Sequence, residues 1–159
     1  MLRMAKLTDY GIVLLSQFAA RQDAAPMTAR ELSVQARLPL PTVGKLLKQL
    51  SHGGLLSSQR GTKGGYFLAR PAREITVAQI IEALEGPMAL TECQAPGVCD
   101  QERFCSVKPN WLVINQTVRD ALSRVTLADM THPIRPLWNF PGAELPARQL
   151  HAPPRSDIR

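Results

Sequence analysis

Cysteine, histidine and aromatic residues are scarce in this chain of 159 residues. It contains three cysteines and three histidines, and aromatic residues make up 5% of it. No apolar run approaches the roughly 18 residues that a helix needs to cross a bilayer. The segment "GTKGG" at 61–65 lacks the Walker spacing, and no GxGxxG pattern occurs. These absences argue against a membrane protein and against a nucleotide-binding enzyme.

Acidic residues are nearly missing from the first 70 positions. This stretch holds ten Lys or Arg and three Asp or Glu, a net charge of +7, whereas residues 71–159 carry −1. A positive excess confined to one half of a chain is expected of a module that binds a polyanion. A solvated basic face without a ligand has the same composition, so the motifs must decide between the two.

The N-terminal segment "MLRMAKLTDYGIVLL" begins with basic residues and continues with apolar ones, as signal peptides do. Asp9 interrupts the apolar run, and no good cleavage site follows. We therefore expect the first helix of a cytoplasmic protein, from about residue 7 to 20, with Thr8 as its cap. Its inward positions recur at helical spacing and are Tyr10, Val13, Leu14 and Phe18.

Two further helices are predicted on either side of a short turn. Thr28 and Glu31 form a capping box at the start of the first, and Pro41 suits the first turn of the second. The second helix has a polar, basic outer face and an inward stripe formed by Val43, Leu46, Leu47 and Leu50. This arrangement is typical of a helix-turn-helix, whose second helix fits the DNA major groove.

A glycine-rich basic loop follows, between expected strands at 55–58 and 66–69. A basic hairpin directly after a helix-turn-helix is typical of the wing of a winged helix, which can touch phosphates or enter a minor groove. A surface hairpin without a ligand is the alternative. The residues expected to contact double-stranded DNA are Thr28, Arg30, Pro41, Thr42, Lys45, Lys48, Arg60, Lys63, Gly64 and Gly65.

The predicted fold class is thus mainly α with a small β-hairpin wing, and a winged helix-turn-helix domain spans residues 1–86. Its last helix begins at a second capping box, Thr76 with Gln79, and ends at Gly86. A cysteine-rich loop at 87–108 leads into a long helix at 109–131. Residues 132–159 hold six of the thirteen prolines and predict a disordered tail.

The long helix carries apolar residues at alternating steps of three and four. They are Trp111, Ile114, Val118, Ala121, Val125 and Ala128. Such a narrow seam favours packing against a second copy of the helix in a homodimer. Packing within the chain against the first helix is the alternative.

Cys93, Cys99 and Cys105 all lie in the loop, at steps of six. Five residues between neighbours let three thiolates converge on one centre. A structural zinc site usually has close cysteine pairs and a fourth nitrogen or sulfur ligand, and no histidine lies near this loop. Soft thiolates suit an iron–sulfur cluster, of either the two-iron or the four-iron type. A zinc site, a thiol switch and inert cysteines remain alternatives.

The ordered motifs "LTDYG", "TARELS", "LPLPTVGKLLKQL", "GLLSSQRGTKGGYFLA" and "ITVAQIIEALEG", followed by the three cysteines, resemble one known family over residues 1 to about 130. This is the family of iron–sulfur regulators typified by IscR and NsrR, and within it the regulators of SUF-system cluster assembly. The resemblance implies a bacterial, homodimeric winged-helix transcription regulator, such as a repressor. It also implies that the three cysteines hold an iron–sulfur cluster.

Two positions depart from the family pattern. IscR-like members carry a histidine ligand three residues after the third cysteine, where this chain has Lys108, a poor ligand. NsrR-like members use an acidic residue near the start of helix one of the partner subunit, a position that matches Asp9. Local competitors for the fourth site are Glu92, Asp100 and Glu102. Gly44 and Lys45 replace the Glu-Gln of IscR, so a different operator is expected.

No base or catalytic histidine motif accompanies the cysteines, so we expect no enzyme, no catalytic residue and no small-molecule substrate. The expected partners are double-stranded DNA and a second copy of the chain, with no membrane. The alternative is a thiol-redox or zinc-bound winged-helix regulator without an iron–sulfur cluster.

Overall fold

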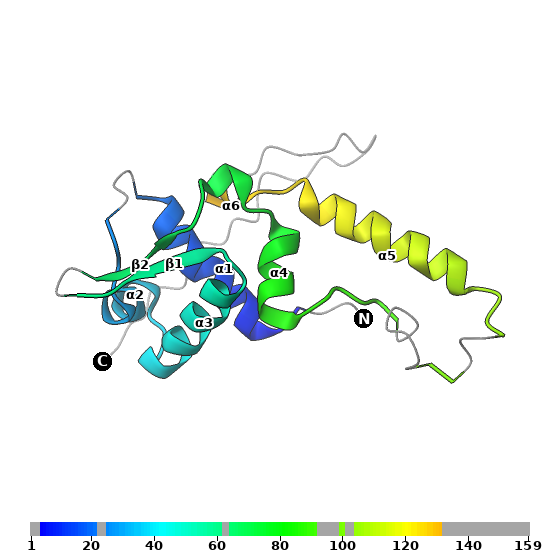
Figure 1. The fold of residues 1–159 in the computed structure, drawn as a ribbon, viewed down its shortest axis with the longest axis horizontal. Helices are drawn as coiled ribbons and strands as arrows, with labels where there is room; N and C mark the ends of the chain where they lie inside the picture. Colours follow the sequence, from blue (N-terminus) through cyan, green and yellow to red (C-terminus); the bar gives the residue numbers. More distant parts are fainter. Residues whose placement is uncertain (1–3, 22–24, 62–63, 92–98, 101–103, 132–159) are drawn as a thin grey trace, which may run out of the picture.

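Of the nine elements in the described residues, eight gather into a head at one end of the molecule, and one long helix extends away from it (Figure 1). The computed structural model describes residues 4–21, 25–61, 64–91, 99–100 and 104–131. The elements in chain order are α1 (Lys6–Ala19), α2 (Ala29–Ala36), α3 (Leu40–His52), β1 (Leu56–Gln59), β2 (Gly65–Leu68), the 3-10 turn η1 (Ala72–Glu74), α4 (Val77–Glu85), α5 (Lys108–Ser123) and α6 (Leu127–Thr131). Within those ranges, no helix is both long and apolar enough to cross a membrane. The expected tail at 132–159 lies outside them.

The core of the head lies where α1, α3 and α4 meet. The inward stripe predicted for α3 is confirmed, since Val43, Leu46, Leu47 and Leu50 are fully buried. In α1 the prediction is right for Leu14 and Phe18 but wrong for Val13, which is 37% exposed. Burying one such leucine contributes roughly 1.5–3 kcal/mol.

The first turn of α1 is capped from outside the helix. Thr8 is not the N-cap that the sequence suggests, because that position is Ala5, which makes no side-chain cap. The Thr8 hydroxyl is instead buried and donates to Oε1 of Glu85, the last residue of α4. The backbone N–H of Ala5 donates to the same oxygen at 3.0 Å. The carboxylate at the end of α4 therefore accepts the hydrogen bonds of two donors at the start of α1.

The predicted capping box of α2 is confirmed. The N–H of Glu31 donates to Oγ1 of Thr28 at 3.2 Å, and the N–H of Thr28 donates to the Glu31 carboxylate at 2.7 Å. Hydrogen bonds from the backbone and then the side chain of Thr28 lower the pKa of Glu31. Because the folded pKa is lowered, this contribution to stability is present above the ordinary pKa and is lost as the pH falls through the lowered value.

The wing is a two-stranded antiparallel hairpin, with Leu56 opposite Leu68 and Gln59 opposite Gly65. Met27 extends it, since Met27 and Tyr66 exchange two backbone hydrogen bonds of 2.8 Å. A Cβ on Gly65 would lie 2.7 Å from the backbone oxygen of Met27, so only glycine allows this close approach. The hairpin is thereby attached to the segment that precedes α2.

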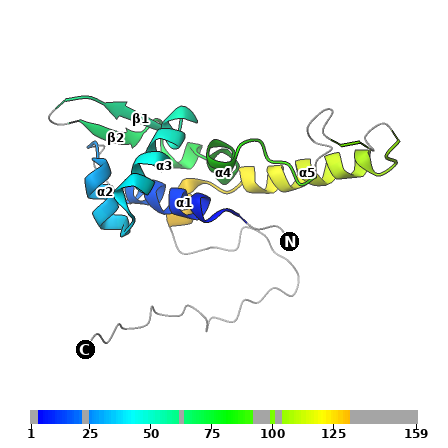
Figure 2. The same cartoon turned by 90° about the horizontal axis from the view of Figure 1, so that it is seen from below.

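The continuous helix predicted at 109–131 is interrupted in the structure. The helix α5 ends at Ser123, and α6 starts at Leu127. Between them the chain pairs with the start of α4: Val77 N donates to Val125 O, and Leu127 N donates to Ile75 O, both at 2.8 Å. Backbone groups used in this bridge cannot continue an i→i−4 ladder. The pairing places α6 against α1 and η1 (Figure 2).

Replacing Leu127 by Ala tests how much this docking contributes to folding. The side chain is fully buried, so Leu127→Ala is expected to lower the unfolding free energy by about 2–5 kcal/mol, measured by urea denaturation. Met130→Ala, on the same helix with a 47% exposed side chain, is the control and should change little. Equal losses for the two variants would contradict the docking of α6.

Candidate nucleic-acid interface and cysteine loop

The outer face of α3 is basic and accessible. Lys45 and Lys48 are exposed, Pro41 is exposed in the first turn, and Thr42 is half-buried. Between positions 28 and 61, Glu31 is the only acidic residue. The basic residues of the same stretch are all exposed: Arg30, Arg37, Lys45, Lys48 and Arg60. This end of the head can therefore attract phosphates, with Glu31 as the only carboxylate of this stretch.

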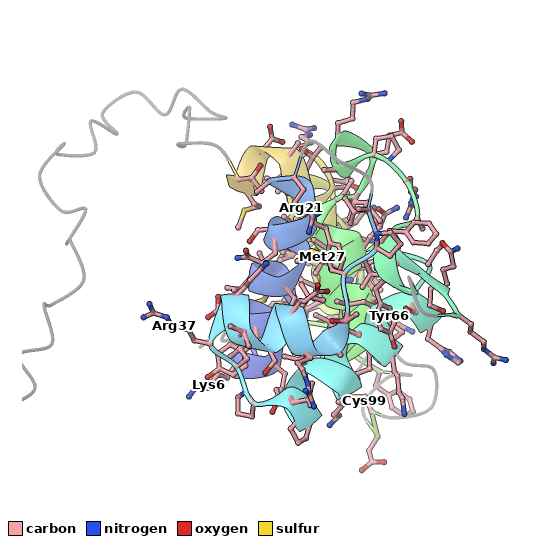
Figure 3. All side chains as sticks on the ribbon, turned by 90° about the vertical axis from the view of Figure 1, so that its left-hand side faces the viewer. Lys6, Arg21, Met27, Arg37, Tyr66 and Cys99 are labelled. Atoms are coloured by element: carbon pink, nitrogen blue, oxygen red, sulfur yellow. The ribbon has the colours of Figure 1, made fainter. Side chains whose placement is uncertain are left out.

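The turn between α2 and α3 holds the helix pair in place. Arg37 ends α2 with φ 53°, a left-handed conformation that a residue with a Cβ rarely adopts. Two hydrogen bonds stabilise the turn: Leu38 N donates to Ser33 O at 3.1 Å, and Ser33 Oγ donates to Leu38 O at 2.6 Å. The Arg37 side chain extends outward from this turn (Figure 3).

The predicted contact residues of the wing and of α2 lie at the same end of the head. Arg60 is exposed at the end of β1, and Lys63 lies outside the described residues. Gly64 is needed for closure of the hairpin loop, because a Cβ there would clash with the carbonyls of Gln59 and Gly61. The Thr28 hydroxyl is engaged by Glu31 at 2.8 Å. Contact between these residues and DNA stays a prediction.

Gly44 is a glycine in the interior of α3 that packing does not require. A Cβ added there would meet nothing within 4 Å. Gly53, at the end of the same helix, is the opposite case, because its Cβ would lie 2.5 Å from that of Ala83 in α4. Gly44 therefore leaves the outer face of α3 open, and Gly53 allows α3 and α4 to approach.

The cysteine loop leaves α4 at Gly86 and returns to the chain at the start of α5. Of the three cysteines predicted to bind a metal, Cys99 and Cys105 are described, and both are half-buried free thiols. Cys93 lies outside the described residues, as do Glu92 and Glu102. Among the residues that are described, no three His, Cys, Asp or Glu side chains lie close enough to hold a metal. The two thiols are soft donors that suit an iron–sulfur or zinc centre equally.

Asp9, the candidate fourth ligand, is exposed in the first turn of α1. Glu85 holds this turn against the end of α4, the last helical residue before the loop. Asp9 therefore lies on the surface near the beginning of the cysteine loop. Asp100, a competitor for the same role, is also exposed.

Most of α5 is exposed although much of it is apolar. Val113 is 67% exposed, and Trp111, Leu112 and Ile114 are 38–44% exposed. The helix packs against α4. Its one buried residue is Asn115, whose side chain bonds to the backbone of Met88 and Leu90.

The sequence interpretation missed three structural residues, Asn115, Glu85 and Thr126. Thr126 and Asp129 form a capping pair that starts α6, and its Thr-x-x-Asp spacing is a visible signal for a new helix. Asn115 could have been noticed as a polar residue next to the predicted apolar seam. Glu85 has no local signal, because its partners Ala5 and Thr8 lie some 80 positions away.

A helix-turn-helix followed by a hairpin wing and a long helix defines a winged-helix regulator. A family model described as "Rrf2: Iron-dependent Transcriptional regulator" matches residues 4–133. The chain belongs to the Rrf2 family of transcriptional regulators.

Relatives and solved structures agree with this assignment. The chain is 26% identical to the HTH-type transcriptional regulator IscR of Escherichia coli, over 82% of this chain and 81% of the relative. The structure of T. potens IscR is 29% identical and matches with a TM-score of 0.60, over 81% of this chain and 85% of that one. CymR, the global cysteine regulator of B. subtilis, is 26% identical with a TM-score of 0.64, over 82% and 97%.

Glycine-to-alanine substitutions test the packing of α3. Gly44→Ala is expected to raise the unfolding free energy by about 0.5–1 kcal/mol, because it adds helix propensity without a clash. Gly53→Ala should lower it, since the new methyl overlaps Ala83. Urea denaturation of both variants checks the pair. The same sign for both changes would contradict the placement of α3 on α4.

Substitution of the α3 lysines separates reading of bases from contact with phosphates. Lys45→Ala should cost about 1–3 kcal/mol on an operator selected from random duplexes and little on unrelated DNA. Lys48→Ala, if it contacts phosphate, should weaken both DNAs alike and reduce the salt slope by about 1. Fluorescence anisotropy at several salt concentrations measures both effects. Equal weakening of both DNAs by Lys45→Ala would exclude a base-reading role.

Proposed function

We propose that this chain is a homodimeric repressor whose affinity for double-stranded DNA depends on an iron–sulfur cluster. The observation that carries the proposal is the pair of free, half-buried thiols, Cys99 and Cys105, before α5 of an Rrf2-family fold. With Cys93 they form a set of three soft donors at equal spacing. Three thiolates suit a cluster better than tetrahedral zinc, for which no fourth sulfur or nearby histidine exists in the sequence.

Asp9 is proposed as the fourth ligand, contributed by the partner subunit. Its exposure in the first turn of α1 supports this role, because an exposed carboxylate can reach a second chain. When bound, a cluster supplies a centre that responds to iron supply or to oxidants by changing state or leaving. An oxygen ligand at one iron would make that site more exchangeable than a fourth thiolate.

The dimer is proposed to form along α5. Trp111 and Ile114, exposed apolar residues three positions apart on α5, share one face that a second α5 could cover. Because the cysteine loop enters α5 directly, loading of the loop would act on the dimer contact. Through α4, which packs against both α3 and α5, it would also act on the head that binds DNA. Likeness to the SUF-type regulators supports genes of iron–sulfur cluster assembly as targets.

A second candidate function is a regulator that uses its thiols without a cluster. It is favoured by the similarity to CymR, since one matching structure, 26% identical with a TM-score of 0.60, is that of the oxidized form of Staphylococcus aureus CymR. In this case Cys99 and Cys105 would form a disulfide or bind zinc. Metal content distinguishes the two candidates.

Anaerobic purification and metal analysis test the cluster. The protein is expected to be coloured, to contain iron and acid-labile sulfide in equal amounts and to lack zinc. Cluster removal should change the affinity for a selected operator at least tenfold, which corresponds to about 1.4 kcal/mol. A colourless protein that resists reconstitution with iron and sulfide would exclude the cluster. Zinc, or a disulfide in its place, would then favour the second candidate.

Asp9→Ala tests the fourth ligand. We expect the cluster of this variant to be lost to an iron chelator at least about tenfold faster than that of the wild type. Glu74→Ala is a control, because Glu74 is also exposed and acidic but lies in η1. Asp100→Ala examines the local competitor. If Asp9→Ala leaves the lifetime and spectrum unchanged, Asp9 is not a ligand.

A further inference from the structure

Three contacts join α4 and the segment after it to α5 and the segment that follows α5. At one end, Thr76 and Thr126 form a backbone bridge. In the middle, Arg119 pairs with Glu82 at 2.9 Å. At the other end, Asn115 bonds to Met88 and Leu90. Residues with higher numbers on the α4 side contact residues with lower numbers on the α5 side. The two segments therefore run antiparallel in a fixed register.

Asn115 is the contact nearest to the cysteines. Its Oδ1 accepts from Leu90 N at 3.2 Å, and its Nδ2 donates to Met88 O at 3.2 Å. The side chain is only 9% exposed. The buried amide pairs with one backbone N–H and one backbone carbonyl of the same segment, as a neighbouring β-strand would do. No apolar or carboxylate side chain can make both hydrogen bonds. The segment at 86–91 therefore cannot slide along α5 without losing two partly buried hydrogen bonds.

The position of Asn115 determines where the cysteine loop begins. Asn115 lies seven residues after Lys108, the first residue of α5, which is about 10 Å along the helix axis. The chain between Leu90 and Lys108 could span more than about 50 Å if extended. Asn115 instead holds the beginning of the loop about two helical turns from its end. Both ends of the segment that carries all three cysteines are thus attached to one helix.

We infer that Asn115 is a positioning residue for the cysteine centre: its two hydrogen bonds to residues 88 and 90 fix the beginning of the cysteine loop on α5. This inference rests on the proposed function, because it concerns how the thiols are brought to a cluster. Asn115 does not itself ligate. It lowers the conformational entropy that the loop loses when three thiolates converge on one centre. It also links this convergence to the register of α4 against α5.

Asn115→Leu tests the inference, with Arg119→Gln as the matched control. The leucine keeps the branching at Cγ and the number of heavy atoms but removes both hydrogen bonds. Arg119→Gln removes the neighbouring contact of α5, a partly exposed ion pair with Glu82 of α4 that is expected to contribute no more than about 1 kcal/mol. Asn115→Asp is a second variant, which keeps the acceptor for Leu90 N and loses the donor for Met88 O. Far-UV circular dichroism verifies that each variant is folded.

The first readout needs no cluster. In the cluster-free protein, amide hydrogen exchange at Leu90 is expected to be at least tenfold faster in Asn115→Leu than in wild type and unchanged in Arg119→Gln. The second readout is the half-time of cluster release to an iron chelator, followed by visible absorption. It should shorten about tenfold or more in Asn115→Leu, by an intermediate factor in Asn115→Asp and little in Arg119→Gln.

The outcomes separate this inference from the proposed function. If the wild type holds a cluster and both Asn115 variants release it at the wild-type rate, the positioning role is overturned and the cluster stands. If Arg119→Gln shortens the half-time as much as Asn115→Leu, general loosening of α5 explains the effect and the inference fails. If the wild type takes up no cluster, the proposed function fails, and Leu90 exchange alone then decides whether Asn115 fixes the segment. Unchanged exchange would refute it.

Discussion

The backbone bridge between residues 75–77 and 125–127 is the constraint on which the arrangement of this molecule depends. Without it, α5 would be held to the head only by the cysteine loop and by the contacts of Asn115 and Arg119 with the α4 side. With it, the chain leaves the head after α4 and returns to the start of the same helix. The burial of Leu127 adds a hydrophobic contribution to the two hydrogen bonds. As a result, α5 is held at its C-terminal end by the domain that is expected to bind DNA.

The helix α4 lies between the basic face of α3 and the helix α5 that follows the cysteine loop, and it contacts both helices. On one side it packs against α1 and α3, whose fully buried residues form the core under the basic face. On the other side it packs against α5, and its end leads to Cys99 and Cys105. Protein interiors are close-packed, so a shift of α4 relative to α5 would also displace the side chains of α3 that pack against α4. A short helix in this position is suited to transmit a change from the cysteine loop to the basic face of α3, where DNA contact is expected.

Much of the head was predictable from sequence because its signals are local. The capping boxes at Thr28 and Thr76 and the apolar stripe of α3 depend on residues three or four positions apart, and the structure confirms them. The hairpin followed from its glycines, to within one residue at each strand. These elements were sufficient to indicate a winged helix.

The errors come from contacts between distant parts of the chain. The break after Ser123 is caused by pairing with the start of α4, which no periodicity within α5 reveals. Thr8 looked like a cap, but its partner is Glu85. For the candidate site, the sequence supplied the three thiols and Asp9 but could not show that Asn115 holds the loop, because that bond depends on how α4 and α5 lie together.

The capping of α1 by Glu85 also has a consequence for synthesis. Because α1 is synthesised before α4, its first turn lacks the Glu85 acceptor until residue 85 has followed it, so the turn that carries Asp9 is completed only together with α4.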